Sequence, residues 1–218
     1  MPSRSYHEAL WEGVPAGLTP PDFALRRRFL LEHVGAGERV LDVGCGEGCF
    51  ADELVRAGAQ VVGIDVAEKP LRRARRSETE SSPIGQRDPG LDLRVVDEGG
   101  SWPLDDASFD VVWAGETIEH VADTAGWLSE IRRVLAPGGR LLLSTPDHGR
   151  LRVLWLACSR RAFEAHFDPR ADHLRFYTRA GLTRLLGELG FVEVSVRAAA
   201  GLPGARRVLL ARAVRSRW

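Results

Sequence analysis

The stretch Arg39 to Phe50, RVLDVGCGEGCF, places an acid, three glycines and two cysteines at the end of an apolar run. Glycines at a strand-to-helix turn let a ligand approach the backbone N–H groups of a helix N-terminus. The spacing is G-x-G-x-G, and Cys49 stands where a dinucleotide-binding turn has its third glycine. Asp42 can accept a hydrogen bond from an ammonium group or from the loop, whereas it would repel a pyrophosphate. The turn therefore favours an amino-acid-bearing ligand over a nicotinamide dinucleotide.

A second group of chemistry-bearing residues, ETIEHV, follows the apolar run FDVVWAG. On the first turn of a helix, Glu116 and His120 would lie four residues apart with Glu119 adjacent, so that three ligand-type groups can converge. His120 can then serve as a base toward a hydroxyl group. The alternative is that Glu119 and His120 only stabilise the loop, and both interpretations stay open.

A third group lies in HFDPRADHLRFYT, which contains His166, Asp168, Asp172, His173, Arg175 and Tyr177. His173 can face an acceptor molecule, or these polar residues can tie the segment to the rest of the fold. Near the N-terminus, Tyr6 and Trp11 are unusual for a disordered tail, so this segment is expected to pack on the domain. We expect the two aromatic residues either to close the ligand pocket or to pack in the ordinary way.

Strands and helices alternate along the part of the chain that must position these residues. Short apolar runs predict strands at 39–44, 59–66, 91–96, 109–115 and 139–146. Helical periodicity falls between them and at 178–190, with Thr178 as N-cap and Gly190 after the end. The runs 191–198 and 206–214 alternate and can pair as an edge hairpin, whereas 77–90 is polar and predicts an exposed loop. The pattern predicts an α/β fold with a parallel sheet covered on both faces.

Composition narrows the class of protein. The 218 residues suit one large domain, and an apolar fraction of 44% can bury a sizeable core. The formal net charge is zero, which disfavours a general nucleic-acid binder. Three cysteines do not make a disulfide framework, and no apolar stretch resembles a signal sequence or a membrane span. We expect a cytoplasmic protein without a membrane partner, present as a monomer or homodimer.

The motif VLDVGCGEG resembles the first motif of class I S-adenosylmethionine-dependent methyltransferases. The resemblance continues through VVGIDVAEKPLRRA, FDVVWAGETIEHVAD and EIRRVLAPGGRLLLSTP, and covers about residues 38–147 in the order of the family. The chain is most similar to the small-molecule branch, which includes ubiquinone-biosynthesis-like enzymes. The resemblance implies a Rossmann-like, doubly wound and mostly parallel seven-stranded sheet with an antiparallel edge hairpin.

The resemblance also implies how a single methyltransferase domain, 1–218, is divided. Residues 1–35 would form an N-terminal cap segment and helix, and 36–147 the cofactor-binding core. Residues 148–177 would form a substrate-lid insertion, and 178–218 the C-terminal helix and edge hairpin.

The residues that bind the cofactor in this family can be matched to positions of this sequence one by one. The loop that holds the methionine part of S-adenosylmethionine corresponds to Asp42, Gly44, Cys45 and Gly46. Asp65 would accept both ribose hydroxyls, as an acid does in dinucleotide folds, and Val66 would lie against adenine. The adenine amino group would meet Asp97, with Glu98 beside it, although DEGGSWPL departs from the commoner family pattern. Backbone groups that meet the cofactor's amino acid correspond to Ala114 and Gly115.

Methyl transfer requires the protein mainly to position a nucleophile opposite the sulfonium and to keep it deprotonated. We predict His120 and His173 as the catalytic residues. ExxEH, formed by Glu116, Glu119 and His120, also resembles a divalent-metal site of some quinone-biosynthesis O-methyltransferases, which is the less favoured alternative. No metal is included in the predicted site.

We therefore predict methyl transfer from S-adenosylmethionine to a small-molecule acceptor, with oxygen as the favoured acceptor atom and S-adenosylhomocysteine as product. One alternative is a catalytically silent scaffold or regulator that retains the cofactor. Another is a methyltransferase acting on RNA or protein. AGET replaces the N/D-P-P-Y/F motif of amino-methylating nucleic-acid enzymes, and no cysteine follows a proline as in cytosine-C5 enzymes. A nicotinamide oxidoreductase is disfavoured by Asp42 and by the missing third glycine.

Overall fold

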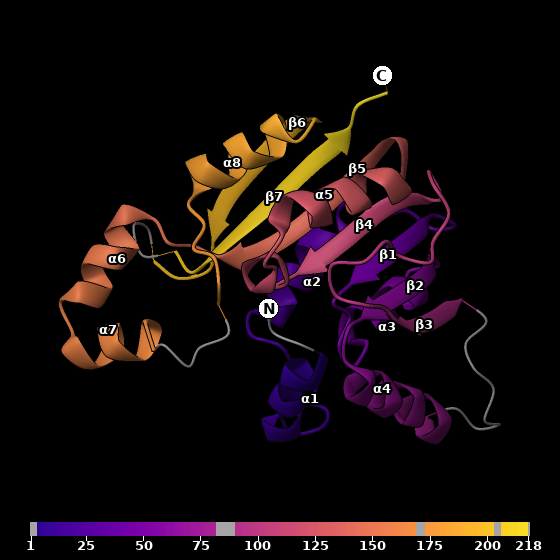
Figure 1. The fold of residues 1–218 in the computed structure, drawn as a ribbon, viewed down its shortest axis with the longest axis horizontal. Helices are drawn as coiled ribbons and strands as arrows, with labels where there is room; N and C mark the ends of the chain where they lie inside the picture. The colour runs from indigo at the N-terminus through magenta and orange to yellow at the C-terminus, as the bar shows by residue number, and fades with distance from the viewer. Residues whose placement is uncertain (1–3, 82–89, 169–172, 203–205, 218) are drawn as a thin grey trace.

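The computed structural model describes residues 4–81, 90–168, 173–202 and 206–217. One seven-stranded sheet has the order β3-β2-β1-β4-β5-β7-β6 (Figure 1). The strands are β1 (Arg39–Val43), β2 (Gln60–Asp65), β3 (Leu91–Val95), β4 (Phe109–Gly115), β5 (Leu135–Pro146), β6 (Phe191–Ala199) and β7 (Val208–Arg215). The first five strands pair in parallel, and β7 runs antiparallel between β5 and β6. This confirms the predicted parallel sheet with an antiparallel hairpin at its edge.

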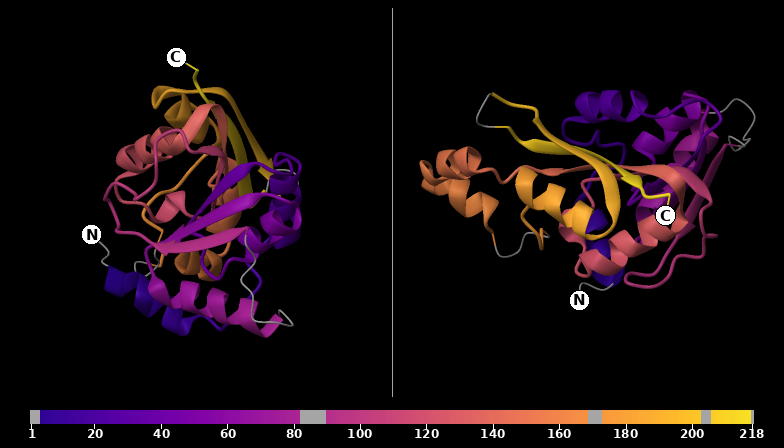
Figure 2. Two further views of the ribbon diagram at one scale, coloured as in Figure 1. Left: turned by 90° about the vertical axis from the view of Figure 1, so that its right-hand side faces the viewer. Right: turned by 90° about the horizontal axis from the view of Figure 1, so that it is seen from above.

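Helices cover both faces of the sheet (Figure 2). They are α1 (Arg4–Gly13), α2 (Phe23–Leu31), α3 (Cys49–Arg56), α4 (Glu68–Ser81), α5 (Thr124–Val134), α6 (Arg150–Ala157), α7 (Arg160–His166) and α8 (Arg179–Glu188), with a short 3-10 helix, η1 (Ile118–His120). One core contains α5 and α8 against the sheet, and a second contains α2 and α3 against the opposite face. In the described part of the chain, no helix has the length and apolar character needed to cross a bilayer.

Local sequence accounts for the ends of several helices. The side chain of Asp123 accepts a hydrogen bond from the N–H of Gly126 at 3.0 Å and begins α5. Thr178 caps α8 in the same way, as predicted, and Gly190 follows the helix with a φ of 83°. Asp22 occupies the N-cap position of α2, but its side chain makes no capping bond and pairs with Arg207 at 2.7 Å instead.

Two local predictions are wrong. The polar segment 77–90 was expected to form a loop, but its first five residues continue α4, which ends at Ser81. Ser, Glu and Thr do not by themselves terminate a helix, and the first proline of this segment comes after Ser81. The remainder of that segment, 82–89, lies outside the described residues. The motif ETIEHV does not open an α-helix: Glu116 has a φ of 55° and only η1 follows it.

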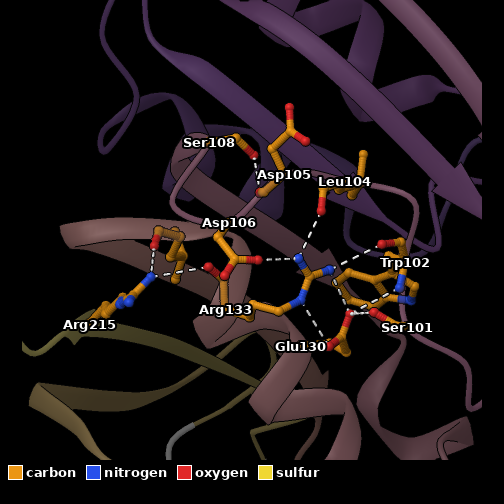
Figure 3. Close-up of polar contacts among 10 residues, drawn as sticks. Ser101, Trp102, Leu104, Asp105, Asp106, Ser108, Glu130, Arg133 and Arg215 are labelled. Atoms are coloured by element: carbon orange, nitrogen blue, oxygen red, sulfur yellow. Dashed lines mark hydrogen bonds and ion pairs between the residues drawn. The ribbon is translucent and has the colours of Figure 1, made fainter.

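One arginine holds the loop between β3 and β4 against α5 (Figure 3). Arg133 donates to the backbone carbonyls of Leu104 at 2.8 Å and Trp102 at 3.1 Å, and it pairs with Glu130 and Asp106. Glu130 in turn accepts the backbone N–H of Trp102 at 2.9 Å. These hydrogen bonds to Glu130 and Asp106 raise the pKa of Arg133 above its usual value despite partial burial. The network fixes the position of the loop that carries Trp102.

Candidate functional site

A cavity of about 810 Å³ opens at the carboxyl edge of β1, β2 and β4, where the strand order reverses between β1 and β4. Its walls come from the ends of these strands, from the loop after β3, from η1 and α5, and from α1. The volume falls in the range of small-molecule sites in proteins. The lining is more apolar than polar, with Trp11, Trp102 and Trp127 among its residues. The place and lining suit a ligand with a flat apolar part and a few polar groups.

The glycine loop between β1 and α3 reaches the floor of this cavity through Gly44. Gly44, Gly46 and Gly48 all have positive φ values, 71°, 56° and 82°. A Cβ on Gly44 would lie 2.7 Å from Oγ1 of Thr117, so the loop and the segment after β4 are in direct contact. A Cβ on Gly46 would lie 3.0 Å from the ring of Trp11. Glycine is therefore required both for the backbone conformation and for the close approach of its neighbours.

Asp65, at the end of β2, lines the cavity and closes the glycine loop. Its Oδ2 accepts the N–H of Gly46 at 3.0 Å, and its Oδ1 accepts the N–H of Ala67 at 2.8 Å. Burial raises the pKa of this carboxyl, and the two backbone hydrogen bonds oppose the rise. A carboxylate oxygen can accept more than one hydrogen bond, so the group retains capacity for hydroxyl groups of a ligand.

Asp42 is buried below the loop and is not among the residues that line the cavity. Burial and the charge of the nearby Asp65 raise its pKa to about 7, and Arg26 opposes the rise. Its Oδ2 has no hydrogen-bond partner among the described residues. The acid that was expected to hold the methionine part of the cofactor is thus buried and not part of the described cavity wall.

Arg26 is a residue that the sequence prediction missed. It lies on the inner face of α2 and is only 2% exposed, with its guanidinium 4.8 Å from the centre of the Phe50 ring. A Cβ on Gly115 would lie 2.5 Å from Nη2 of Arg26, which places the cation under the end of β4. Burial lowers its pKa, and the charges of Glu116, Glu119 and Asp42 oppose this. An available signal was its position three and four residues before the buried Phe29 and Leu30, which puts an arginine on the apolar face.

The N-terminal helix α1 closes one side of the cavity. His7 and Trp11 line it, whereas Tyr6 is exposed and does not. Glu8 accepts the backbone N–H of Lys69 at 3.2 Å at the start of α4. Arg73 of α4 donates to the carbonyl of Trp11 at 3.1 Å. Residues before the strands thus pack on the domain, as predicted.

The loop after β3 brings both predicted acids to the cavity. Asp97 pairs with Arg4 at 2.7 Å, and Glu98 lies 3.9 Å from Nε2 of His7. The side chain of Asp97 is largely exposed, and its carboxylate already forms an ion pair with an arginine of α1.

The predicted cofactor residues divide into two sets. Those that line the cavity are Gly44, Asp65, Val66, Asp97 and Glu98. The others, which lie outside its described lining, are Asp42, Cys45, Gly46, Ala114 and Gly115. Burial raises the pKa of the Cys45 thiol well above its usual value, and a Cβ on Gly63 would lie 2.9 Å from its Sγ. The thiol is therefore a small packing group and not a nucleophile.

Of the three predicted ligand-type residues after β4, Glu116 lies outside the group to which Glu119 and His120 belong. Glu116 lines the cavity, and its Oε1 has no hydrogen-bond partner in the part of the chain that the structure describes. Glu119 turns into the core, where Oε2 accepts the Oγ1–H of Thr145 at 2.9 Å. Burial, and then the charge of Glu116, raise the pKa of Glu119 to about 8. The predicted convergence of Glu116 with Glu119 and His120 is therefore not formed.

A different group forms instead. Ligand atoms of Glu119, His120 and His173 all lie within 4.8 Å of one another. The rings of His120 and His173 are 4.9 Å apart between centroids, and only His120 lines the cavity. The segment that carries His173 is held beside η1, because Leu174 donates its N–H to the carbonyl of Glu119 at 2.8 Å. Residues 169–172, which include the candidate Asp172, lie outside the described residues.

The remaining candidates of the insertion lie apart from the cavity. His166 packs against His148, with ring centroids 5.1 Å apart. Arg175 donates to the carbonyl of Ala122, and Tyr177 is buried with its hydroxyl 3.4 Å from the carbonyl of Ile118. No described residue of 148–177 lines the cavity.

Comparisons with known proteins identify the family to which this chain is similar. Residues 20–196 match a family model described as a methyltransferase domain. A ubiquinone biosynthesis O-methyltransferase of Albidiferax ferrireducens is 40% identical over 138 residues, which are 63% of this chain and 52% of that protein. A probable S-adenosylmethionine-dependent methyltransferase of Mycolicibacterium smegmatis is 35% identical over 185 residues, 80% of this chain and 62% of that protein. The chain thus spans between half and two thirds of the length of these relatives.

A solved structure has a similar fold. The phosphoethanolamine N-methyltransferase 2 of Haemonchus contortus, in complex with S-adenosylmethionine, superposes with a TM-score of 0.70 at 16% identity. The match covers 98% of this chain and 57% of that one.

Proposed function

The chain belongs to the class I S-adenosylmethionine-dependent methyltransferases, and we propose that it transfers the methyl group to oxygen on a small-molecule acceptor. One observation carries the proposal. The cavity joins the glycine loop and Asp65, where the cofactor would lie, to His120 at the end of η1, where an acceptor would lie. The likeness to ubiquinone biosynthesis O-methyltransferases supports oxygen as the acceptor atom.

The residues present fit this cofactor. Val43, Gly44 and Thr117 line the floor, where the side chain of Thr117 packs against Gly44 in the place that a Cβ would take. Ile64, Val66, Val96 and Trp102 offer apolar surface for an adenine ring. The unpartnered Oε1 of Glu116 is a buried acceptor that suits an ammonium group. Arg26 supplies the positive charge behind this wall for the cofactor's carboxylate end.

S-adenosylmethionine, when bound, supplies an electrophilic methyl group. The chain's own residues then have three tasks. Asp65 would bind the ribose hydroxyls and at the same time fix the loop through Gly46. His120 would accept the proton of the acceptor hydroxyl. α1, with Trp11 and His7, would exclude water from the cavity.

A second mechanism is favoured by one observation. Glu119, His120 and His173 bring their ligand atoms within 4.8 Å of one another, so a divalent cation bound there would lower the pKa of an acceptor hydroxyl in place of a base. A carboxylate and two imidazoles are a donor set that suits zinc or a related transition metal. Both mechanisms keep the same reaction and the same cofactor site.

Calorimetry with S-adenosylhomocysteine tests the cofactor assignment, and a labelled-methyl assay with phenols, carboxylic acids and amines tests the acceptor class. We expect binding in the micromolar range and label transfer to a phenol. No binding at high micromolar ligand would overturn the cofactor site. Binding without transfer to any compound would favour a scaffold, and transfer to RNA or protein would assign the enzyme to a macromolecular substrate.

A further inference from the structure

The large apolar side chains that the structure exposes are concentrated in one segment. Of twelve such side chains among the described residues, seven belong to residues 151–176. This segment contains α6 and α7, which pack on each other and project from the body of the molecule beside the carboxyl end of β5 (Figure 1). Monomeric soluble proteins seldom expose so much apolar surface in one place unless it binds something.

Helix α6 turns its apolar stripe outward. Leu151, Leu154 and Trp155 are 62%, 60% and 64% exposed, and their i, i+3, i+4 spacing puts them on one face of the helix. Leu156, on a different face, is buried. A helix that covers a core shows the opposite arrangement, with its stripe inward. The outward stripe therefore contributes little apolar surface to the packed core.

Arginine residues border the stripe. Arg150 begins α6 and Arg161 lies on α7; both are exposed, and neither has an ion-pair partner among the residues that the structure describes. Arg152 and Arg160 add two more cations, of which Arg160 pairs with Glu164 at 2.8 Å. Arginine together with leucine, tryptophan and phenylalanine is the composition of elements that lie in the headgroup region of an anionic bilayer.

We propose that α6 and α7 form a peripheral docking element for an anionic membrane surface. The stripe of Leu151, Leu154 and Trp155 would enter the boundary between headgroups and acyl chains, and Arg150 and Arg161 would meet lipid phosphates. The sequence alone predicted no membrane partner, because it contains no span. A helix that lies in the interface does not need one.

The element is connected to the catalytic side of the molecule. The chain that returns from α7 donates the N–H groups of Leu174 and Arg175 to the carbonyl of Glu119, at 2.8 and 3.1 Å, next to His120 in the cavity wall. A molecule docked through this element would present the carboxyl edge of its sheet, and with it the cavity, near the lipid surface. The docking itself does not depend on methyl transfer.

Flotation of the full chain with vesicles tests the proposal. Vesicles of phosphatidylcholine alone are compared with an equimolar mixture of phosphatidylcholine and phosphatidylglycerol. We expect binding to the mixed vesicles only, weakening with added salt. The variant L151Q/L154Q/W155Q should lower the partition coefficient by about tenfold or more. R150Q/R161Q should lower it by about fivefold for each arginine.

Matched controls change equally exposed residues elsewhere. L18Q/L202Q and R184Q should bind vesicles like the unchanged protein, and all variants should keep the same circular dichroism because the altered side chains are exposed. Failure of the unchanged protein to bind mixed vesicles, or equal binding by the triple variant, would overturn the proposal. So would a dimer that the triple variant converts to a monomer in light scattering without any vesicle binding, which would assign the stripe to self-association.

Discussion

The Oδ2 atom of Asp65 accepts the backbone N–H of Gly46 at 3.0 Å, so the acid that ends β2 also closes the glycine loop that follows β1. Two adjacent strands therefore share one carboxylate at the cavity. This relationship ties the shape of the loop to the residue proposed to bind the ribose, and it makes the loop sensitive to changes in a neighbouring strand.

Replacing Asp65 should weaken cofactor binding through both of its contacts. D65A should cost about 1–3 kcal/mol of S-adenosylhomocysteine affinity, because it removes the ribose acceptor and releases the N–H groups of Gly46 and Ala67. D65N keeps one acceptor oxygen and should lose less. Calorimetry measures both, with D105N as a control on an exposed acid. Unchanged affinity in D65A would place the ribose elsewhere.

A side chain at Gly44 should destabilise the fold for two reasons, the strain of a positive φ and a clash with Thr117. G44A combines a positive φ with a Cβ that would lie 2.7 Å from Thr117, whereas G37A has a positive φ of 81° and nothing within 4 Å. We expect G37A to lose about 1 kcal/mol in urea unfolding and G44A to lose about 1–3 kcal/mol more. Equal losses would show that the contact with Thr117 relaxes at no cost.

The buried acid Asp42 should make stability fall as pH rises. Its pKa is about 7 in the folded protein against an ordinary value of 3.8, so the folded state binds more protons than the unfolded state between these values. By linkage, this group lowers the free energy of unfolding as pH rises from about 4 to about 7, by at most about 1.4 kcal/mol per pH unit. Above pH 7 its effect is constant.

Urea unfolding at a series of pH values measures this dependence. D42N should remove the contribution, so the difference between the two proteins should grow from acid pH to neutrality in favour of the variant. D105N controls for a change in net charge alone. Parallel curves for D42N and the unchanged protein would mean that Asp42 is ionised throughout this range.

Removal of the His120 imidazole should slow methyl transfer without weakening the binding of the cofactor. We expect H120Q to lower kcat by about 10²–10⁴-fold if the ring is the base, with S-adenosylhomocysteine affinity within twofold of the unchanged protein. Chelation separates the two mechanisms. If EDTA abolishes activity, zinc restores it and the variant H173Q is also inactive, then the cluster of Glu119, His120 and His173 binds a metal. Insensitivity to EDTA would support the base.

Arg133 should stabilise the loop that carries Trp102. R133Q removes the donors to two carbonyls and to Glu130 and Asp106, and should lower the free energy of unfolding by about 1–3 kcal/mol (Figure 3). Because Trp102 lines the cavity, cofactor affinity should fall as well. R184Q, on the exposed face of α8, is the matched control and should change neither quantity.

The order of elements could be predicted from local sequence, as could the residue types at one side of the cavity. Apolar runs of strand length, glycines with positive φ and an acid at the end of β2 depend on neighbours in the chain, so their types and spacing were sufficient to place the loop and Asp65. Thr178 could be assigned as a cap for the same reason, since its partner Gly181 is three residues away.

Tertiary structure alone decided the rest, because it depends on residues that are distant in the chain and on the direction in which each side chain turns. Arg26 reaches the end of β4 only because α2 packs under it, and Glu119 joins Thr145 and not Glu116 because the backbone at Glu116 is left-handed. The contact of His120 with His173, and the outward stripe of α6, likewise follow from how the segment after β5 returns to the sheet. Periodicity in α6 indicates a helix, but it does not say which face meets the protein and which meets its surroundings.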